Sequence, residues 1–172
     1  MAYPRKYNKD ELSTWFTDKV KSTGNYQRNL RKIILSDSER KRGHPVLGRM
    51  FIYEYDPKHK KTLPIYDRFP LCFPIEQYGD GFLGLNLHYL GVNDRAVLLN
   101  RLSSYLSNNN YDATTKLKMS YSLLNSVKKL EIAKVCVKRY LFNHVRSQFI
   151  EIQAGEWDKA IELPIEVFVR KK

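Results

Sequence analysis

The side chains best suited to chemistry in this chain are lysines and arginines, which recur in short clusters. Cationic groups at this density neutralise phosphates without reading base sequence. We therefore expect the clusters to bind nucleic acid. The candidate contacts are Arg28, Arg31, Lys32, Arg40, Lys41, Arg42, Lys58, Lys60, Lys61, Lys128, Lys129, Lys134, Lys138, Arg139 and Arg146.

The cations are concentrated in two blocks. The chain has 172 residues and carries 30 Lys and Arg against 18 Asp and Glu, a formal net charge of +12. Residues 1–49 hold 12 cations against 5 acids, and residues 116–146 hold 8 against 1. Because Glu131 is the only acid in the second block, ion pairs within that block cannot balance its charge. The asymmetry favours a binding surface for an anionic partner.

Three acidic residues close together in the sequence could serve a different chemistry. Glu54, Asp56 and Asp67 could together hold a divalent metal, as paired carboxylates do in nucleases. Asp56, which precedes Pro57, and Asp67 are equally typical turn residues. We predict no catalytic residue, no metal site and no cofactor, and hence a protein that is not an enzyme. A metal-dependent nuclease stays as an alternative.

The cysteines and histidines do not indicate metal binding. Cys72 and Cys136 are far apart in apolar surroundings, which is typical of buried free thiols in a reducing compartment. The four histidines lack the close pairing of metal ligands. We expect a structural role for His88, on the strand side opposite the leucines, and a place on the core face of a helix for His144.

Aromatic side chains form a second group that could contact nucleic acid. They make up 13% of the chain, and bases stack on exposed rings in many single-strand-binding proteins. Packing within a sheet is the simpler expectation for most of them, because they lie in segments with strand patterns. The candidates are Tyr53, Tyr55, Tyr66, Phe69 and Tyr89.

Hydrophobic periodicity predicts the elements that must position these side chains. Residues 50–56 and 82–90 alternate like strands, and residues 148–152 could return to the same sheet. Residues 68–76 are β-prone, but Pro70 and Pro74 confine them to an edge or an irregular strand. Helices are expected over 9–21 and 26–34, from Asn93, after a cap at Asp112, and over 137–145.

These patterns together predict an α+β fold. Its centre is a small antiparallel β-sheet or partial barrel at about residues 49–90, flanked by N-terminal and C-terminal helices. Residues 36–49 have the composition of a charged, flexible linker. We therefore divide the chain into a basic helical N-terminal arm, residues 1–48, and an α+β core domain, residues 49–172.

Two segments resemble a known family. They are residues 49–90, RMFIYEYDPKHKKTLPIYDRFPLCFPIEQYGDGFLGLNLHYL, and more weakly residues 137–164, VKRYLFNHVRSQFIEIQAGEWDKAIELP. Both are similar to small virion- or DNA-associated proteins of T-even-type tailed bacteriophages. The resemblance implies either a DNA end protector or a structural protein of the neck, tail or baseplate. It includes no catalytic motif, so it transfers no functional residue.

Our leading hypothesis is a non-enzymatic bacteriophage protein that binds DNA through its basic blocks without sequence specificity. The alternative is a virion structural protein that docks on acidic neighbouring subunits, and other virion proteins are further expected partners. The sequence has no apolar N-terminal signal region and no stretch long enough to span a membrane. We accordingly expect no membrane partner, and a location in the host cytoplasm, the virion or both.

Overall fold

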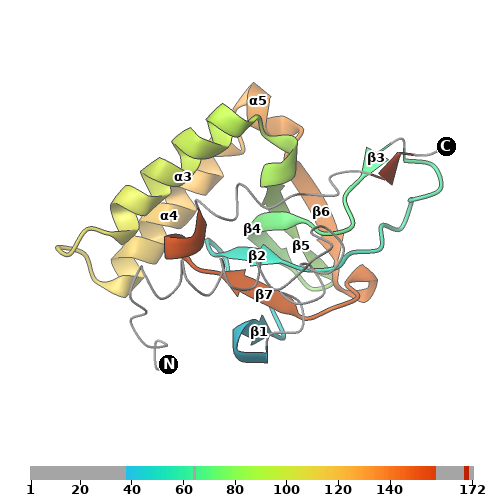
Figure 1. Ribbon diagram of the computed structural model, residues 1–172, viewed down its shortest axis with the longest axis horizontal. Coiled ribbons are helices and arrows are strands. Elements are labelled where there is room, and N and C mark those ends of the chain that lie inside the picture. The colour runs from blue at the N-terminus through green and yellow to red at the C-terminus, as the bar shows by residue number, and fades with distance from the viewer. Residues whose placement is uncertain (1–37, 64, 158–168, 171–172) are drawn as a thin grey trace, which may run out of the picture.

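A six-stranded antiparallel sheet forms the centre of the molecule (Figure 1). The computed structural model describes residues 38–63, 65–157 and 169–170. The strand order in the sheet is β1-β7-β2-β4-β5-β6. The strands are β1 (Lys41–Arg42), β2 (Met50–Ile52), β4 (Leu71–Tyr78), β5 (Gly81–Asn86), β6 (Val137–Leu141) and β7 (Phe149–Ile152). A separate antiparallel pair joins β3 (Ile65–Tyr66) to β8 (Val169–Arg170).

Helices cover one face of this sheet. Figure 1 shows α3 (Val92–Leu106) and α4 (Ala113–Val127) side by side on that face, with the short α5 (Glu131–Lys134) at one end. The carboxylate of Asp112 accepts a hydrogen bond of 2.7 Å from the backbone N–H of Thr115, which confirms the predicted cap of α4. Helices packed on an antiparallel sheet confirm the α+β class. Single turns of 3-10 helix occur at η1 (Ser38–Arg40), η2 (Leu87–Tyr89), η3 (Phe142–His144) and η4 (Ala154–Glu156).

The two faces of the sheet carry different cores, because successive strand residues point to opposite sides. In β2, Met50 and Ile52 face the helices, while Phe51 lies on the other face. The helix-side cluster also contains Leu85, Leu102 and Leu124 among its buried members. The aromatic cluster on the opposite face consists of Phe51, Tyr53, Tyr55, Cys72, Phe82, Tyr140 and Phe149.

The helix predicted over residues 137–145 was wrong, because these residues begin with strand β6. Strand β6 pairs with β5 along its whole length, from Val137 opposite Leu85 to Leu141 opposite Gly81. Apolar residues at helical spacing also suit a strand that packs on both faces. Here Val137 packs against the helix-side cluster and Tyr140 belongs to the aromatic cluster.

The strand with two prolines was predicted to be an edge strand or an irregular strand, and the structure shows the second of these. Strand β4 lies inside the sheet, between β2 and β5. Its register shifts between Pro74 and Glu76, so the strand is irregular, as predicted. A bulge tolerates a residue that has no N–H to donate. The carbonyl of Pro74 still accepts a hydrogen bond of 2.9 Å from the N–H of Gly48.

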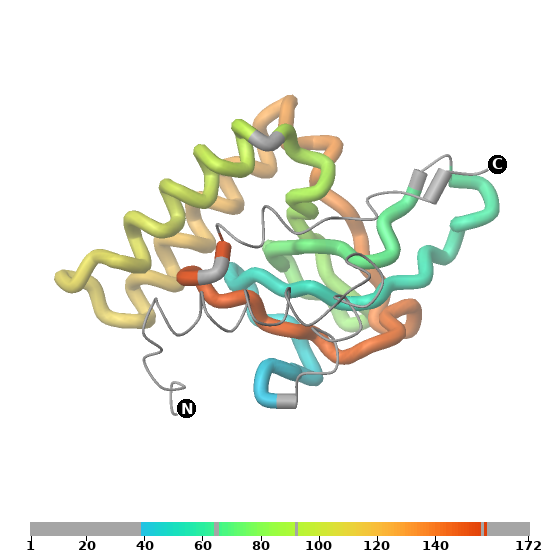
Figure 2. The backbone as a smooth tube through the Cα atoms, viewed as in Figure 1, coloured from blue at the N-terminus to red at the C-terminus, as the bar shows by residue number. Residues whose placement is uncertain are grey.

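The sheet extends beyond residues 49–90 in both directions. Strand β7 runs beside β2 (Figure 2) and pairs Ile150 with Ile52, which confirms the predicted return of residues 148–152. Strand β1 pairs with β7, so Lys41 and Arg42 lie in the sheet and not in a flexible linker. Both precede the boundary that we placed after residue 48. The helices predicted over 9–21 and 26–34 lie outside the described residues.

Candidate nucleic-acid interface

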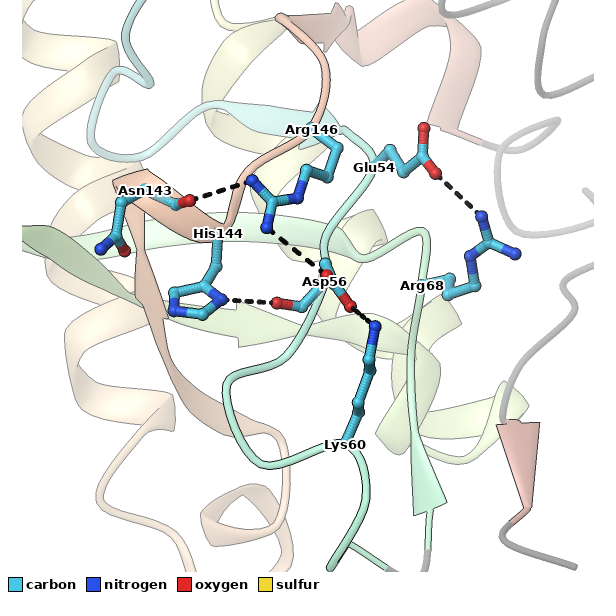
Figure 3. Close-up of polar contacts among 7 residues, drawn as sticks. All are labelled: Glu54, Asp56, Lys60, Arg68, Asn143, His144 and Arg146. Carbon is cyan, nitrogen blue, oxygen red and sulfur yellow. Dashed lines mark hydrogen bonds and ion pairs between the residues drawn. The ribbon is translucent and has the colours of Figure 1, made fainter.

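A cluster of charged side chains fixes the basic loop at residues 57–63 (Figure 3). The carboxylate of Asp56 accepts a hydrogen bond of 2.7 Å from Lys60 Nζ and one of 3.4 Å from Arg146 Nη2. The hydrogen bond from Lys60 is the main reason why the pKa of Asp56 is lowered. His144 Nδ1 donates to the carbonyl of Asp56 at 2.8 Å. The start of the loop is therefore held from two sides.

Backbone hydrogen bonds complete this anchor. The N–H of Asp56 donates to the carbonyl of His144 at 2.9 Å, and the N–H of Arg146 donates to the carbonyl of Glu54 at 2.8 Å. The Glu54 side chain accepts from Arg68 Nη2 at 2.9 Å. His144, which we predicted on the core face of a helix, lies instead in η3 and serves this anchor.

A pocket of about 410 Å³ lies between this loop and strand β6. Its cationic lining comes from Lys58, Lys138 and Arg139, and His59 adds an imidazole ring. Among the described residues, Asp67 is the only acid in its lining. The structure thus brings together one cation of the loop and two of the C-terminal basic block. The tyrosines in its lining are Tyr55, Tyr66, Tyr89 and Tyr140.

The tyrosines divide into a floor and a wall. Tyr55 and Tyr140 are 6% and 4% exposed and stack edge to face with a centroid separation of 5.0 Å. Tyr66 and Tyr89 are half-buried. Burial raises the pKa of Tyr89 to about 12, so its hydroxyl stays protonated at neutral pH. The Lys138 ammonium lies 4.4 Å from the centre of the Tyr89 ring, in a cation–π contact.

A buried hydrogen-bond network supports the pocket floor. Asp67 is 4% exposed, and its Oδ2 accepts from Asn86 Nδ2 at 2.9 Å and lies 2.5 Å from His88 Nδ1. Asn86 also donates to the Tyr140 hydroxyl at 3.0 Å. Because each group has a fixed partner, the floor is held in one arrangement. The predicted structural role of His88 is consistent with this contact.

The three acids of the nuclease alternative do not meet in the structure. Glu54 pairs with Arg68, and Asp56 pairs with Lys60 and Arg146. Asp67 is engaged in the buried network. Within the described part of the chain, no group of three or more His, Cys, Asp or Glu is placed to hold a metal ion.

Six of the predicted cations form ion pairs with other described residues, and four of these six pairs join distant segments. Lys128 pairs with Glu76, at 3.4 Å, and Arg139 pairs with Asp80. Lys60 and Lys134 are the exceptions, because their partners Asp56 and Glu131 lie four and three residues away in the chain. Our inference from the lone acid in residues 116–146 therefore missed the acids that the fold supplies. The paired cations are Arg42, Lys60, Lys128, Lys134, Arg139 and Arg146.

The other predicted contacts are distributed more widely. Lys58 lines the pocket, and Lys61 and Lys129 are exposed elsewhere on the surface. Arg40 lies in η1 and Lys41 in β1, at the opposite edge of the sheet from β6. Arg28, Arg31 and Lys32 lie outside the described residues. The structure therefore groups Lys58, Lys138 and Arg139 at this pocket, while Asp56 separately brings Lys60 and Arg146 together.

Sequence reasoning missed several residues of the pocket. Tyr140 falls in the segment that we predicted as a helix, and His59 is not among the predicted contacts. The alternation of Lys138 with Tyr140 is the signal that could have placed both on one side of a strand. Of the predicted stacking candidates, Tyr53 and Tyr55 are buried, as expected for sheet packing.

The prediction that both cysteines are buried and unpaired is confirmed. Cys72 and Cys136 are buried and unpaired, and burial raises the pKa of both thiols. Among the helices in the described ranges, none is long and apolar enough to cross a membrane.

Comparison with known proteins identifies the family. The family model of the phage T4 terminal DNA protecting protein matches residues 7–172, nearly the whole chain. No curated protein and no solved structure matches. The match confirms the resemblance to T-even-type phage proteins and extends it to the N-terminal basic block. The chain therefore belongs to the family of the phage T4 terminal DNA protecting protein.

Proposed function

We propose that this protein binds the ends of double-stranded DNA and denies exonucleases access to them, without cutting DNA itself. The family match over residues 7–172 carries the proposal, because the family description names terminal DNA protection. The pocket beside β6 supports it. Cations and aromatic rings in one place are the combination that binds nucleic-acid backbones and bases.

The mechanism is phosphate neutralisation with little sequence readout. Lys58 is exposed and has no ion pair within the described ranges, and Lys138 is held over the Tyr89 ring. Arg139 is less available, because its guanidinium pairs with Asp80 and lies 3.8 Å from the centre of the Tyr78 ring. Lys58 and Lys138 are therefore the strongest phosphate ligands. A protein of this kind acts in the infected host cytoplasm, the virion or both.

An exonuclease-protection assay tests the proposal. Linear duplex DNA is incubated with the full-length protein and then with an exonuclease and Mg²⁺. We expect the digestion rate to fall as the protein concentration rises, and protection to weaken steeply as salt rises. Digestion that is unaffected by saturating protein at low salt would contradict the proposal. A parallel sample without exonuclease checks for cleavage, and any magnesium-dependent cutting would restore the nuclease alternative.

Paired charge-removal variants test the interface. In Lys58→Gln/Lys138→Gln we expect affinity for linear duplex to fall about tenfold and the slope of log affinity against log salt to decrease by about two. The matched control Arg101→Gln/Lys118→Gln removes two exposed cations from α3 and α4. It should bind within about twofold of wild type. Equal losses in both double variants would place the interface elsewhere.

A patch on α5 favours a second candidate function, docking on a neighbouring virion subunit. Leu130, Ile132 and Val135 are 53%, 58% and 57% exposed, and exposed apolar side chains in a group mark protein contacts. Lys129 and Lys134 lie beside them in the sequence and would suit an acidic partner. If this candidate holds, Ile132→Glu reduces the number of copies in purified particles and leaves DNA binding unchanged. Unchanged incorporation contradicts it.

A further inference from the structure

We propose that the pocket between the 57–63 loop and β6 takes the terminal nucleotide of one DNA strand, with its base unpaired and stacked on Tyr66. This inference rests on the proposed function, since it specifies which part of a DNA end the protein holds. It adds a source of end selectivity that phosphate neutralisation alone lacks, because phosphates occur all along the duplex.

The size of the pocket selects a single nucleotide. Its volume of about 410 Å³ is within the range of about 300–1,000 Å³ that is usual for small-ligand sites. A stacked duplex, with base pairs above and below one another, cannot enter such a cavity. A nucleotide can enter only after it leaves the stack and loses its pairing partner.

This requirement favours the end of a strand. An internal nucleotide must lose its base pair and two stacking contacts before it can be extruded. The terminal nucleotide loses its base pair and one stacking contact, and no backbone continues beyond it. Extrusion is therefore easiest at an end, and the pocket converts that difference into preferential binding.

Tyr66 is the ring best placed to receive the base. The floor rings Tyr55 and Tyr140 are in contact with each other and buried, and the Tyr89 ring is engaged by Lys138. Tyr66 is half-buried in the pocket wall and has no ring contact within the described ranges. Among the tyrosines of the lining, its ring is therefore the one that we assign to stack on a base.

The charges around the pocket suit the phosphate of the same nucleotide. Lys58 and Lys138 belong to the loop and to β6, on the two sides of the opening. The anchor at Asp56 fixes the loop that carries Lys58, and the cation–π contact fixes Lys138. Because Lys138, the loop that carries Lys58 and the pocket floor are held before DNA arrives, little ordering of these parts accompanies binding.

Modified DNA hairpins test this inference with the full-length protein. Each hairpin has one open duplex end and a fluorescent label in its loop, and binding is measured by anisotropy. One hairpin carries an abasic residue at the 5′ terminus, one at the 3′ terminus and one at an internal position. We expect one of the terminal abasic hairpins to bind about tenfold more weakly, because the stacked base is missing. The internal abasic hairpin should bind within about twofold of the parent.

The outcomes separate this inference from the proposed function. If both terminal abasic hairpins bind like the parent, the pocket does not hold a terminal base. A closed dumbbell without ends tests the proposed function itself. If the dumbbell binds as tightly as the open hairpin, the protein does not recognise ends at all. If the dumbbell binds more weakly than the open hairpin but every abasic hairpin binds as tightly as the parent, only the inference about the pocket is overturned.

A substitution of Tyr66 tests whether the terminal base stacks on that ring. Tyr66→Leu should weaken binding to the open hairpin about tenfold and leave the dumbbell unchanged. On the terminal abasic hairpin that lost affinity, the same variant should cause no further loss, because the ring no longer has a base to contact. Tyr111→Leu, which removes an exposed tyrosine before α4, is the matched control and should bind like wild type. Additive losses would assign Tyr66 a role unrelated to the terminal base.

Discussion

The two faces of the central sheet use different means to exclude water. The helix-side cluster is mainly aliphatic and is covered by α3 and α4. The aromatic cluster on the other face packs tyrosines and phenylalanines edge to face, for example Tyr53 against Tyr140 at a centroid distance of 5.6 Å. The buried polar residues Asp67, Asn86 and His88 adjoin this second face.

The difference shows why the candidate interface lies on the aromatic side. Aliphatic side chains pack by volume and tolerate many arrangements. Tyr140 is also fixed by a directional hydrogen bond from Asn86, which itself contacts Asp67. Rings held in this way can present a defined surface to a ligand at the edge of the cluster. The helix-side cluster supplies stability, and the aromatic side supplies stability and the pocket.

The largest expected effect comes from opening a cavity on the helix side. Leu102→Ala truncates a fully buried side chain of α3 and should lower the free energy of unfolding by about 2–5 kcal/mol. The control Val97→Ala, at a 67% exposed position of the same helix, should change it by less than about 0.5 kcal/mol. Chemical denaturation measures both. DNA affinity of Leu102→Ala, measured where the variant is still folded, should equal that of wild type; a loss would tie the helix side to binding.

A substitution that overfills the aromatic cluster should lower the free energy of unfolding somewhat less than Leu102→Ala does. A Cβ at Gly84 would lie 2.2 Å from Cys72 Sγ and 3.2 Å from the Tyr140 ring. Gly84→Ala should therefore destabilise the protein by about 1–3 kcal/mol and also weaken DNA binding, because it displaces the pocket floor. Gly79→Ala is the control, since nothing lies within 4 Å of its added Cβ. If Gly84→Ala is destabilised but binds DNA as tightly as wild type, the position of the pocket floor does not affect DNA binding.

The sequence predicted most of the helix side, because its signals are local. The periodicity of α3 and α4 and the cap at Asp112 depend on residues within a few positions of one another. Even there, Val97 is exposed although it is an apolar residue of α3. Strand β6 was mistaken for a helix because its identity depends on hydrogen bonds to β5, more than fifty residues earlier in the chain.

The candidate site was harder to predict for the same reason. Its cations were identified, but their ion-pair partners come from other segments, such as Glu76 for Lys128 and Asp80 for Arg139. Sequence spacing cannot show which cations the fold leaves available. Nor can it show that Lys58 lies across a pocket from Lys138, because eighty residues of chain separate them.

A smaller effect is expected from removing one hydroxyl on the aromatic side. Tyr140→Phe leaves the ring in place but deprives Asn86 Nδ2 of its 3.0 Å acceptor, which should cost about 1 kcal/mol in stability. Affinity for DNA ends should fall severalfold, because the floor loses one of its fixed contacts. Tyr121→Phe on α4 is the control, since that hydroxyl makes no hydrogen bond within the described ranges. Equal melting curves for Tyr140→Phe and wild type would show that the network does not stabilise this face.

The smallest expected effect is that of the Asp112 cap of α4, a helix on the opposite face of the sheet. The pH dependence of stability reveals this effect. Hydrogen bonds from Thr115 lower the pKa of Asp112 below its ordinary value of 3.8. A lowered folded-state pKa means that the carboxylate stabilises the protein above about pH 4 and that this contribution is lost as the pH falls further. Asp112→Ala should therefore melt about 2–4 °C below wild type at pH 7, and the gap should shrink towards pH 3. Asp112→Asn keeps a capping side chain without a titrating group, so its melting temperature should stay near that of wild type at pH 7 and fall less on acidification. A constant gap between Asp112→Ala and wild type down to pH 3 would show that the charge of the cap contributes nothing, and that α4 depends on its packing against the sheet alone.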